Sequence, residues 1–268
     1  MDILYYASAE MKKVEMVISR FNEDLAWTED EPFAGLPCVI YNKGANSDFR
    51  VPTETIRIES LPNLGREGHT YLHHIVSNYG SLAEITVFLP GSANHPCKIG
   101  PASNMVREVR TRNCAVFANA RFRTPGIARA LGSFVLDSYV ITDARNLAAN
   151  PESSLDPASP RPFGRWFRKH FDGLIMQYFV MGGIFSIARR DVLQHPKSYY
   201  QGFLRELCTT NPEAGHFVER SWTSMFYPLK DTIVLAKKEN NLVSLEPIPR
   251  KRRTKRAVGK SRKSRKSS

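Results

Sequence analysis

The feature that most limits the possible folds is a series of short apolar segments, each ending in a polar or glycine-containing turn. The first, residues 14–18, gives way to the polar sequence FNED, the second is CVIYNKG, and a third is EITVFLPG at residues 84–91. Apolar segments of this length, bounded by turn residues, are typical of buried β-strands. Each strand is therefore predicted to carry a polar loop at its carboxyl end.

Residues 61–80, LPNLGREGHTYLHHIVSNYG, lie between the second and third strands and have a helical pattern. Apolar residues recur every four positions at Tyr71, Ile75 and Tyr79, and Gly80 is placed to end the helix. Strands that alternate with helices through short connections indicate an α/β fold with a mostly parallel central sheet flanked by helices. Ligands of such Rossmann-like folds bind at the carboxyl ends of the strands.

The pattern extends over one α/β domain, which we expect to span residues 1–249. Residues 143–165 contain four prolines among many Ser, Asn and Ala residues, which predicts a long surface loop or lid. Residues 125–141 fit either a helix or a strand. Further helices and a last strand at residues 232–237 are expected to complete the domain.

Positive charge is concentrated at the carboxyl end of the chain. Eleven of the 38 Lys and Arg residues follow Pro249, and removing them from the net charge of +12 leaves residues 1–249 near +1. Residues 250–268 contain no acidic residue and are predicted to be disordered. Such a tail is suited to nuclear import or to nonspecific contact with nucleic acid or an anionic surface; a solubilising extension is the alternative.

Several classes of protein are disfavoured by what the sequence lacks. No stretch approaches the roughly twenty apolar residues of a transmembrane helix, and the first residues do not form a signal peptide. The four cysteines are scattered, which favours a reducing compartment, so we expect an intracellular protein, cytoplasmic or nuclear. P-loop, dinucleotide-binding and nucleophile-elbow motifs are absent, which disfavours those enzyme classes.

Polar residues that follow the strands are candidates for ligand binding. Glu23 and Asp24 follow the first strand, where carboxylates can accept hydrogen bonds from a ribose or a base. The alternative is a helix N-cap, with Asn22 as the capping residue. Lys43 follows the second strand and suits a phosphate, although an isolated lysine is often only solvated. His95 follows the third strand and is either a ligand contact or an ordinary loop histidine.

The start of the helix in residues 61–80 offers a second group of candidates. Arg66 and Glu67 flank the free N–H groups of the first turn, which favour an anion such as a diphosphate. His69 and His73 share a helical face, as two metal ligands would. Because no H-E-x-x-H pattern or third ligand accompanies them, a structural or substrate-contacting role is favoured over metal binding.

The carboxyl-terminal half adds a glycine pair and a helical carboxylate. Gly182 and Gly183 precede a strand and allow a ligand or a neighbouring strand to approach the backbone closely. Glu219 and Trp222 are three residues apart on one predicted helical face, so a proton-accepting carboxylate would lie beside a ring that can stack on a sugar. Residue types alone favour the alternative, a surface glutamate beside a core tryptophan.

The strings ISRFNEDLAW, YNKG, LPNLGREGHTYLHHIVSNY, ITVFLPG, GGIFSIARRDVLQHPKSYY and ERSWTSMF, in this order across residues 14–228, resemble domain-of-unknown-function family 3431. That family is distantly similar to glycosyltransferases of the GT-A fold. The resemblance rests on the strand ending in NED, the glycine pair before the R-R-D turn, and the late helix that carries Glu219.

The resemblance implies transfer of a sugar from a nucleotide-diphospho-sugar to a hydroxyl of a glycan or protein acceptor. Glu219 would be the catalytic base, and Arg220 and Trp222 would bind the acceptor. The donor would be bound by Asn22, Glu23, Asp24, Asn42, Lys43, Arg66, Glu67, His69, His95, Gly182 and Gly183.

The sequence departs from the GT-A pattern in having no D-x-D motif, which in those enzymes holds Mn²⁺ or Mg²⁺ on the donor diphosphate. FLPGSANH stands at the expected place. Three explanations remain open: Arg66, Lys43 and histidines neutralise the phosphates, a metal is held differently, or the protein does not catalyse transfer. In the last case the alternative function is a non-catalytic, transferase-like binding protein whose basic tail contacts nucleic acid.

Overall fold

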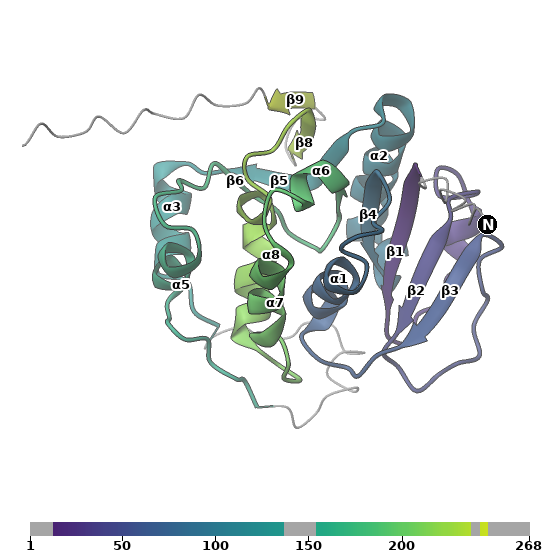
Figure 1. The fold of residues 1–268 in the computed structure, drawn as a ribbon, viewed down its shortest axis with the longest axis horizontal. Helices are drawn as coiled ribbons and strands as arrows, with labels where there is room; N and C mark the ends of the chain where they lie inside the picture. Colours follow the sequence, from purple (N-terminus) through teal and green to yellow (C-terminus); the bar gives the residue numbers. More distant parts are fainter. Residues whose placement is uncertain (1–12, 137–153, 237–241, 246–268) are drawn as a thin grey trace, which may run out of the picture.

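The structure, a computed structural model, describes residues 13–136, 154–236 and 242–245 (Figure 1). It has an α/β fold with helices on both faces of a central sheet, as expected from the sequence. The basic tail, residues 250–268, and the first part of the proline-rich segment, residues 143–153, lie outside the described residues. Among the residues described, no helix has the length and apolar character needed to cross a membrane.

The sheet is mixed but mostly parallel, with the strand order β3-β2-β1-β4-β7-β5-β8-β9. Its strands are β1 (Val14–Arg20), β2 (Cys38–Asn42), β3 (Thr55–Ser60), β4 (Ile85–Pro90), β5 (Ala115–Phe122), β6 (Tyr178–Phe179), β7 (Phe185–Ala188), β8 (Thr232–Ala236) and β9 (Leu242–Leu245). Strand β1 is parallel to β2 and β4, and β7 runs antiparallel between β4 and β5. The residues just before β7 therefore lie at the same edge as the carboxyl ends of β1, β4 and β5.

The strand order reverses at β1. From β1 it continues outward through β2 to β3, and then returns to place β4 on the other side of β1. Ser19 pairs with Pro90 where the two central strands end. Because the loops after β1 and β4 diverge in opposite directions, a crevice opens between them, and such a crevice is where open α/β sheets bind their ligands.

The helices confirm most of the helical segments expected from the sequence. They are α1 (Arg66–Ser77), α2 (Pro96–Arg112), α3 (Pro125–Gly132), α5 (Phe163–His170), α6 (Arg189–Val192), α7 (Lys197–Arg205) and α8 (Glu213–Met225), with 3₁₀ turns η1 (Ala26–Glu29) and η2 (Gly91–Asn94). Helix α1 ends before Gly80, because the backbone N–H of Asn78 already caps it by donating to the carbonyl of His74. Of residues 125–141, for which the sequence left a helix or a strand open, the first eight form helix α3.

Alternate residues of the strands face two separate cores. Val17 and Phe88 belong to the core on the side of α1, α5, α7 and α8. Met16, Ile18 and Val87 belong to the core on the side of α2 and η1. This alternation is the period-2 pattern of a strand buried on both faces, and it explains why β1, β2 and β4 read as continuous apolar segments.

The described end of the proline-rich segment is packed against α8. The carboxylate of Glu213, which is fully buried, accepts hydrogen bonds from the backbone N–H groups of Leu136 and Ala158 and forms an ion pair with Arg161 at 3.0 Å. Helix α5 begins at Phe163, so the prediction of a loop up to residue 165 was wrong at its carboxyl end.

An aromatic cluster centred on Phe185 joins the sheet to the helices that cover it. The ring centroid of Phe185 lies 4.9 Å from that of Trp222 in α8, 5.1 Å from Phe88 in β4 and 5.8 Å from Tyr71 in α1. All four side chains are 1% exposed or less. The cluster therefore holds α1 and α8 at fixed positions above the sheet edge where the crevice opens.

We predict that Phe185→Ala lowers the free energy of unfolding by about 3–5 kcal/mol, because the cavity left in a close-packed cluster adds to the lost burial. The control is Ile56→Ala in β3, whose side chain is 47% exposed and whose loss should change stability by about 0.5 kcal/mol or less. Urea unfolding followed by circular dichroism measures both. Equal effects of the two substitutions would contradict the assignment of this cluster as the centre of the core.

Candidate functional site

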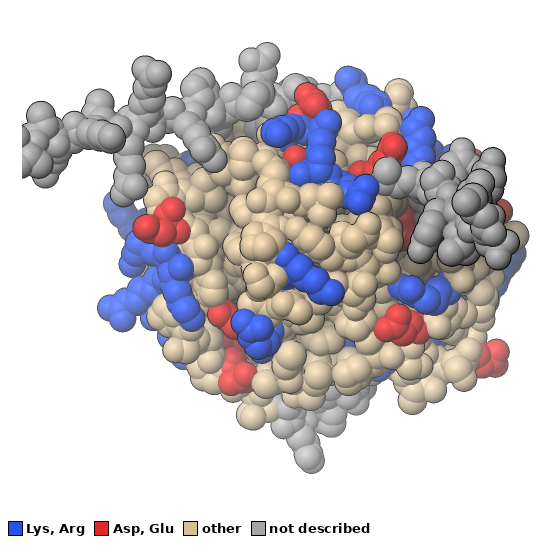
Figure 2. Space-filling view, viewed as in Figure 1, with Lys and Arg blue, Asp and Glu red and all other residues tan. Residues whose placement is uncertain are grey.

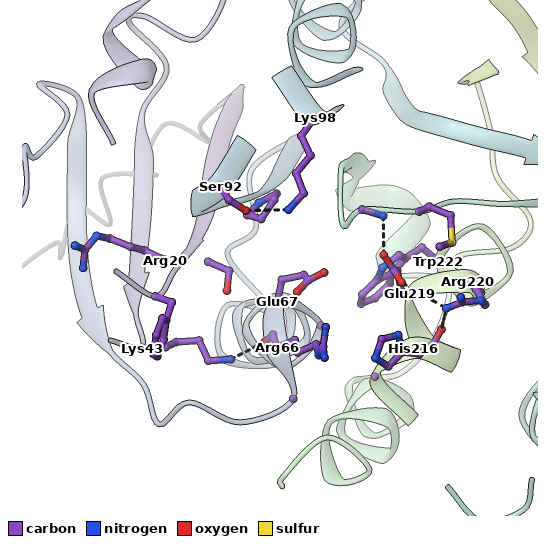
Figure 3. A pocket seen from close by; sticks show the side chains of 18 of the residues that line it. Arg20, Lys43, Arg66, Glu67, Ser92, Lys98, His216, Glu219, Arg220 and Trp222 are labelled. Atoms are coloured by element: carbon purple, nitrogen blue, oxygen red, sulfur yellow. Dashed lines mark hydrogen bonds and ion pairs between the residues drawn. The ribbon is translucent and has the colours of Figure 1, made fainter. Parts of the chain in front are cut away.

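A cavity of about 530 Å³ opens at the carboxyl ends of β1, β2 and β4 and extends to α8 (Figure 3). It occupies the crevice created by the reversal at β1. Its walls come from the β1 end, the first turns of α1 and α2, the end of β5, the residues before β7, and one face of α8. Segments distant in sequence thus meet at one site, and the volume is that of a small-molecule pocket.

Lys43 fixes the entrance to α1. Its ammonium donates hydrogen bonds to the backbone carbonyls of Leu64 and Arg66. On the other side of this segment, the backbone N–H of Gly65 donates to the carbonyl of Thr209 at 2.8 Å. Burial lowers the pKa of Lys43 to about 8, although the nearby Glu67 opposes that shift. A lysine with this pKa is still mostly charged at neutral pH.

Arg66 and Lys98 enter the cavity from different helices. Arg66 has a backbone φ of +53°, a left-handed conformation that is uncommon for a residue with a side chain. Its guanidinium makes no hydrogen bond or salt bridge to any described residue, and Figure 3 shows it inside the cavity. Lys98, from the first turn of α2, donates to the Ser92 hydroxyl at 2.8 Å and points toward the same space. Both cations are available to a bound anion.

Two carboxylates, Glu67 of α1 and Glu219 of α8, face this space, and their pKa values are shifted in opposite directions (Figure 3). Burial raises the pKa of Glu219, and the charge of Glu67 raises it further. Burial acts on Glu67 in the same direction, but Lys98, Arg66 and Lys43 outweigh it and hold the pKa of Glu67 below its ordinary value. Glu67 is therefore a fixed anion, whereas Glu219 is suited to exchange a proton.

The glycine pair before β7 positions both carboxylates. The backbone N–H of Gly182 donates to Oε1 of Glu219 at 2.6 Å. Gly183 has a φ of +63°, and a Cβ atom there would lie 2.8 Å from Cγ of Glu67. Tyr71 donates from its hydroxyl to the carbonyl of Gly183 at 2.9 Å, which ties the pair to α1. The close approach predicted at this pair is therefore an approach to Glu67.

The α8 wall carries His216 and Arg220 next to Glu219. Nη1 of Arg220 lies 3.5 Å from Oε2 of Glu219 and donates to the carbonyl of His216 at 2.8 Å. Burial lowers the pKa of His216 to about 4, and the charges of Arg66 and Arg220 contribute, so its ring is neutral at pH 7. This wall thus presents one arginine, one neutral imidazole and one carboxylate.

Trp222 borders the cavity but is only 1% exposed. Its ring stacks on Phe185 and Phe226. Core residues enclose the ring, so its predicted contact with a sugar ring of the acceptor stays a prediction. The alternative, a core tryptophan next to a glutamate, describes it.

Of the three polar residues predicted in the FNED turn, Glu23 lines the cavity. Asn22 and Asp24 are exposed and do not line it. The Asp24 carboxylate accepts from the backbone N–H of Ala26 at 2.6 Å, and the Asn22 side chain accepts from the backbone N–H of Asn46 at 3.2 Å. These two residues therefore order the loop, close to the capping role that was the alternative.

Asn42, His69 and His95 do not line the cavity, and each has contacts elsewhere. Asn42 accepts a hydrogen bond from the buried guanidinium of Arg20 at 2.7 Å. His95 is the N-cap of α2, where its Nδ1 accepts from the backbone N–H of Cys97 at 3.3 Å. His69 is buried with its ring stacked on that of His73 at a centroid distance of 6.3 Å.

The cavity has an excess of positive charge. The cationic residues around it are Arg20, Lys43, Arg66, Lys98, Arg121 and Arg220, and the acidic ones are Glu23, Glu67 and Glu219. Figure 3 shows the side chain of Arg20 directed away from the cavity, which leaves five cations against three carboxylates. Within the described part of the chain, no group of three or more His, Cys, Asp or Glu side chains is arranged to hold a metal. The arrangement favours an anionic ligand.

Lys98, Arg121 and His216 were not identified from the sequence. Lys98 lies in the HPCK sequence at the start of α2, directly after the third predicted strand, so the rule that ligands bind at strand ends could have found it. Arg121 at the end of β5 obeys the same rule, but that strand was not assigned from the sequence. His216 lies three residues before Glu219 on the same face of α8, and no motif in the sequence marks it as a site residue.

We predict that Gly183→Ala lowers the free energy of unfolding by about 1–3 kcal/mol, because the positive φ is strained for alanine and its Cβ would displace Glu67. Gly100→Ala in α2 is the matched control, since a Cβ there meets nothing within 4 Å and alanine favours a helix. Chemical unfolding of both variants tests this. Unchanged stability of Gly183→Ala would show that the turn can move away from Glu67.

A search of curated proteins gives no match to this chain. The model of one protein family, described as "Protein of unknown function (DUF3431)", matches residues 16–241. The match includes every element that lines the cavity, from β1 to α8. The chain therefore belongs to the DUF3431 family.

Proposed function

We propose that this protein is a glycosyltransferase that moves a sugar from a nucleotide-diphospho-sugar to an acceptor hydroxyl. The observation that carries the proposal is the position and charge of the cavity, which opens between β1 and β4. The side chains of Arg66 and Lys98 enter it, and neither forms an ion pair with a residue that the structure describes. The reversal of the strand order at β1 and the position of Glu219 on α8, beside the cavity, support the proposal.

In this proposal the diphosphate lies between Arg66 and Lys98, close to the first turn of α1. A guanidinium binds phosphate oxygens in pairs, and an ammonium adds a point charge. The free N–H groups of the first helical turn favour the same ligand. Lys43 supports this site indirectly, because its own ammonium is bound to the carbonyls of Leu64 and Arg66.

The residues present do not fit the divalent metal that GT-A enzymes hold with D-x-D. The cavity carboxylates are already engaged: Glu23 accepts from the backbone N–H groups of Phe21 and Asn22, and Glu219 accepts from Gly182. Glu67 lies among the cations that stabilise its charge. We therefore assign charge neutralisation at the diphosphate to Arg66 and Lys98 and derive no step through a metal.

Glu219 is the general base of the proposed reaction. The acceptor hydroxyl oxygen forms a bond to the anomeric carbon, its proton passes to the Glu219 carboxylate, and the bond from the anomeric carbon to the diphosphate breaks. The nucleoside diphosphate leaves with the bonding electrons, and the cations stabilise its charge. Arg220 and the N–H of Gly182 hold the carboxylate in position. The carboxylate must be unprotonated to act as a base. Because its pKa is raised, the ionised carboxylate of Glu219 binds a proton more strongly than an ordinary glutamate does.

We predict that nucleotide-diphospho-sugars bind in the presence of a metal chelator and that Arg66→Met and Lys98→Met each weaken binding about tenfold to a hundredfold, the usual range for a hydrogen bond to a charged group. Calorimetric titration with a panel of donors measures this. The control is Arg107→Met, since Arg107 is exposed on α2, does not line the cavity, and donates from its side chain to Asn104 at 3.3 Å. Binding that requires Mn²⁺, or affinity unchanged in both cavity variants, would contradict the proposed phosphate site.

We predict that Glu219→Gln lowers turnover by about a hundredfold to ten-thousandfold, the range for general-base assistance, while donor affinity stays close to that of the wild type. The wild-type rate should rise with pH as Glu219 loses its proton, with a midpoint above the ordinary glutamate pKa. Single-turnover assays across pH measure both effects. Full turnover by the variant would remove Glu219 as the base, and donor binding with no transfer by the wild type would favour a non-catalytic binding protein.

A further inference from the structure

The end of the molecule formed by residues 121–136 and 160–179 is strongly basic; we refer to it as the basic lobe. It contains the end of β5, helices α3 and α5, and the turn that leads to β6. Its exposed cationic side chains are Arg121, Arg123, Arg129, Arg165, Arg168 and Lys169. Asp172 is the only acidic residue in these two ranges. Figure 2 shows Lys and Arg side chains gathered at the end of the molecule where α3 and α5 lie in Figure 1.

Five of these six cations are not used to hold the fold together. Lys169 lies 3.7 Å from the Glu206 carboxylate. The side chains of the other five make no ion pair or hydrogen bond with any residue that the structure describes. Cations that stay close together without acidic partners repel one another, so the lobe is stabilised by a surface of opposite charge.

Helix α5 separates its charges from its apolar side chains. Phe163, Trp166 and Phe167 are buried against the core, whereas Arg165 and Arg168 are exposed on the other side. The buried face fixes the orientation of α5, so the arginines are presented outward as a rigid set.

The turn after α5 adds an apolar side chain to the same lobe. Ile175 is 70% exposed, the highest exposure among the described large hydrophobic residues. The adjacent Leu174 packs partly against the core, which anchors the turn. An exposed isoleucine in a lobe that also carries unpaired cations matches a lipid bilayer surface, where the side chain enters the headgroup region while the cations meet anionic headgroups.

A nucleic acid fits the same lobe less well. Proteins that bind single strands stack bases on exposed aromatic rings. The aromatic side chains of the lobe whose exposure is described are buried or half-buried, and Phe134 is covered by the guanidinium of Arg220 at 4.1 Å. An exposed Ile175 gives no advantage against a phosphate backbone.

We propose that the basic lobe docks this protein on the surface of an anionic lipid bilayer, with Ile175 inserted among the headgroups. Arg121 belongs to both the lobe and the cavity wall, so docking brings the cavity mouth close to the bilayer. The inference does not depend on the proposed sugar transfer, because it uses only the charge and exposure of the lobe.

The first test is co-sedimentation of the full chain with vesicles of phosphatidylcholine containing about 30% phosphatidylserine. Arg165→Glu/Arg168→Glu should weaken binding at least tenfold. The control Arg50→Glu/Arg107→Glu makes the same change in net charge at exposed positions outside the lobe and should change binding less than threefold. Equal losses in the two double variants would show general charge attraction and would overturn the proposal, as would a lobe variant that binds like the wild type.

The second test locates the contact. The three native tryptophans are at most 6% exposed, so Ile175→Trp adds a single exposed reporter. We expect brominated phospholipid in the anionic vesicles to quench this added fluorescence strongly. Ile56→Trp, at a 47% exposed position in β3, is the control and should show little quenching. Equal quenching at the two positions would overturn the proposal, and so would lobe-dependent binding to duplex DNA without binding to vesicles.

Discussion

The position of the first turn of α1 is the constraint on which the rest of the site depends. Lys43, desolvated at the end of β2, binds the carbonyls of Leu64 and Arg66, and the N–H of Gly65 binds Thr209 just before α8. The turn is thereby held between the sheet edge and α8. Arg66 keeps a left-handed backbone there, with its guanidinium in the cavity. Strain of this kind persists where the surroundings over-determine the conformation, and it is frequent at functional sites.

The same turn sets the electrostatics of the cavity. Glu67 follows Arg66 and lies among cations, so it keeps its charge, and that charge raises the pKa of Glu219 across the cavity. The glycine pair completes the arrangement, since Gly182 binds Glu219 and Gly183 leaves room for Glu67. The surroundings thus shift the pKa values of two carboxylates of one residue type in opposite directions.

The sequence predicted those parts of the fold that have strong periodicity and those site residues that follow a buried strand. Strands β1, β2 and β4 are apolar on both faces, so Lys43, Glu23 and the start of α1 could be placed at one edge of the sheet. Strand β3 was missed because it is an edge strand with mostly exposed side chains between two prolines.

Asp24 and His95 were predicted to bind the ligand because they follow buried strands. Side chains that cap a turn or helix are of the same residue types and occur at the same strand ends, so the sequence alone does not distinguish a capping role from ligand binding. In the structure the Asp24 carboxylate accepts a hydrogen bond from the N–H of Ala26, and His95 is the N-cap of α2.

The proposed phosphate site is tested most directly by a crystal structure of the protein with a nucleoside diphosphate. It predicts the diphosphate within hydrogen-bond distance of the Arg66 guanidinium and the Lys98 ammonium. Density for the nucleotide at another place, or an unliganded cavity at saturating nucleotide, would contradict it.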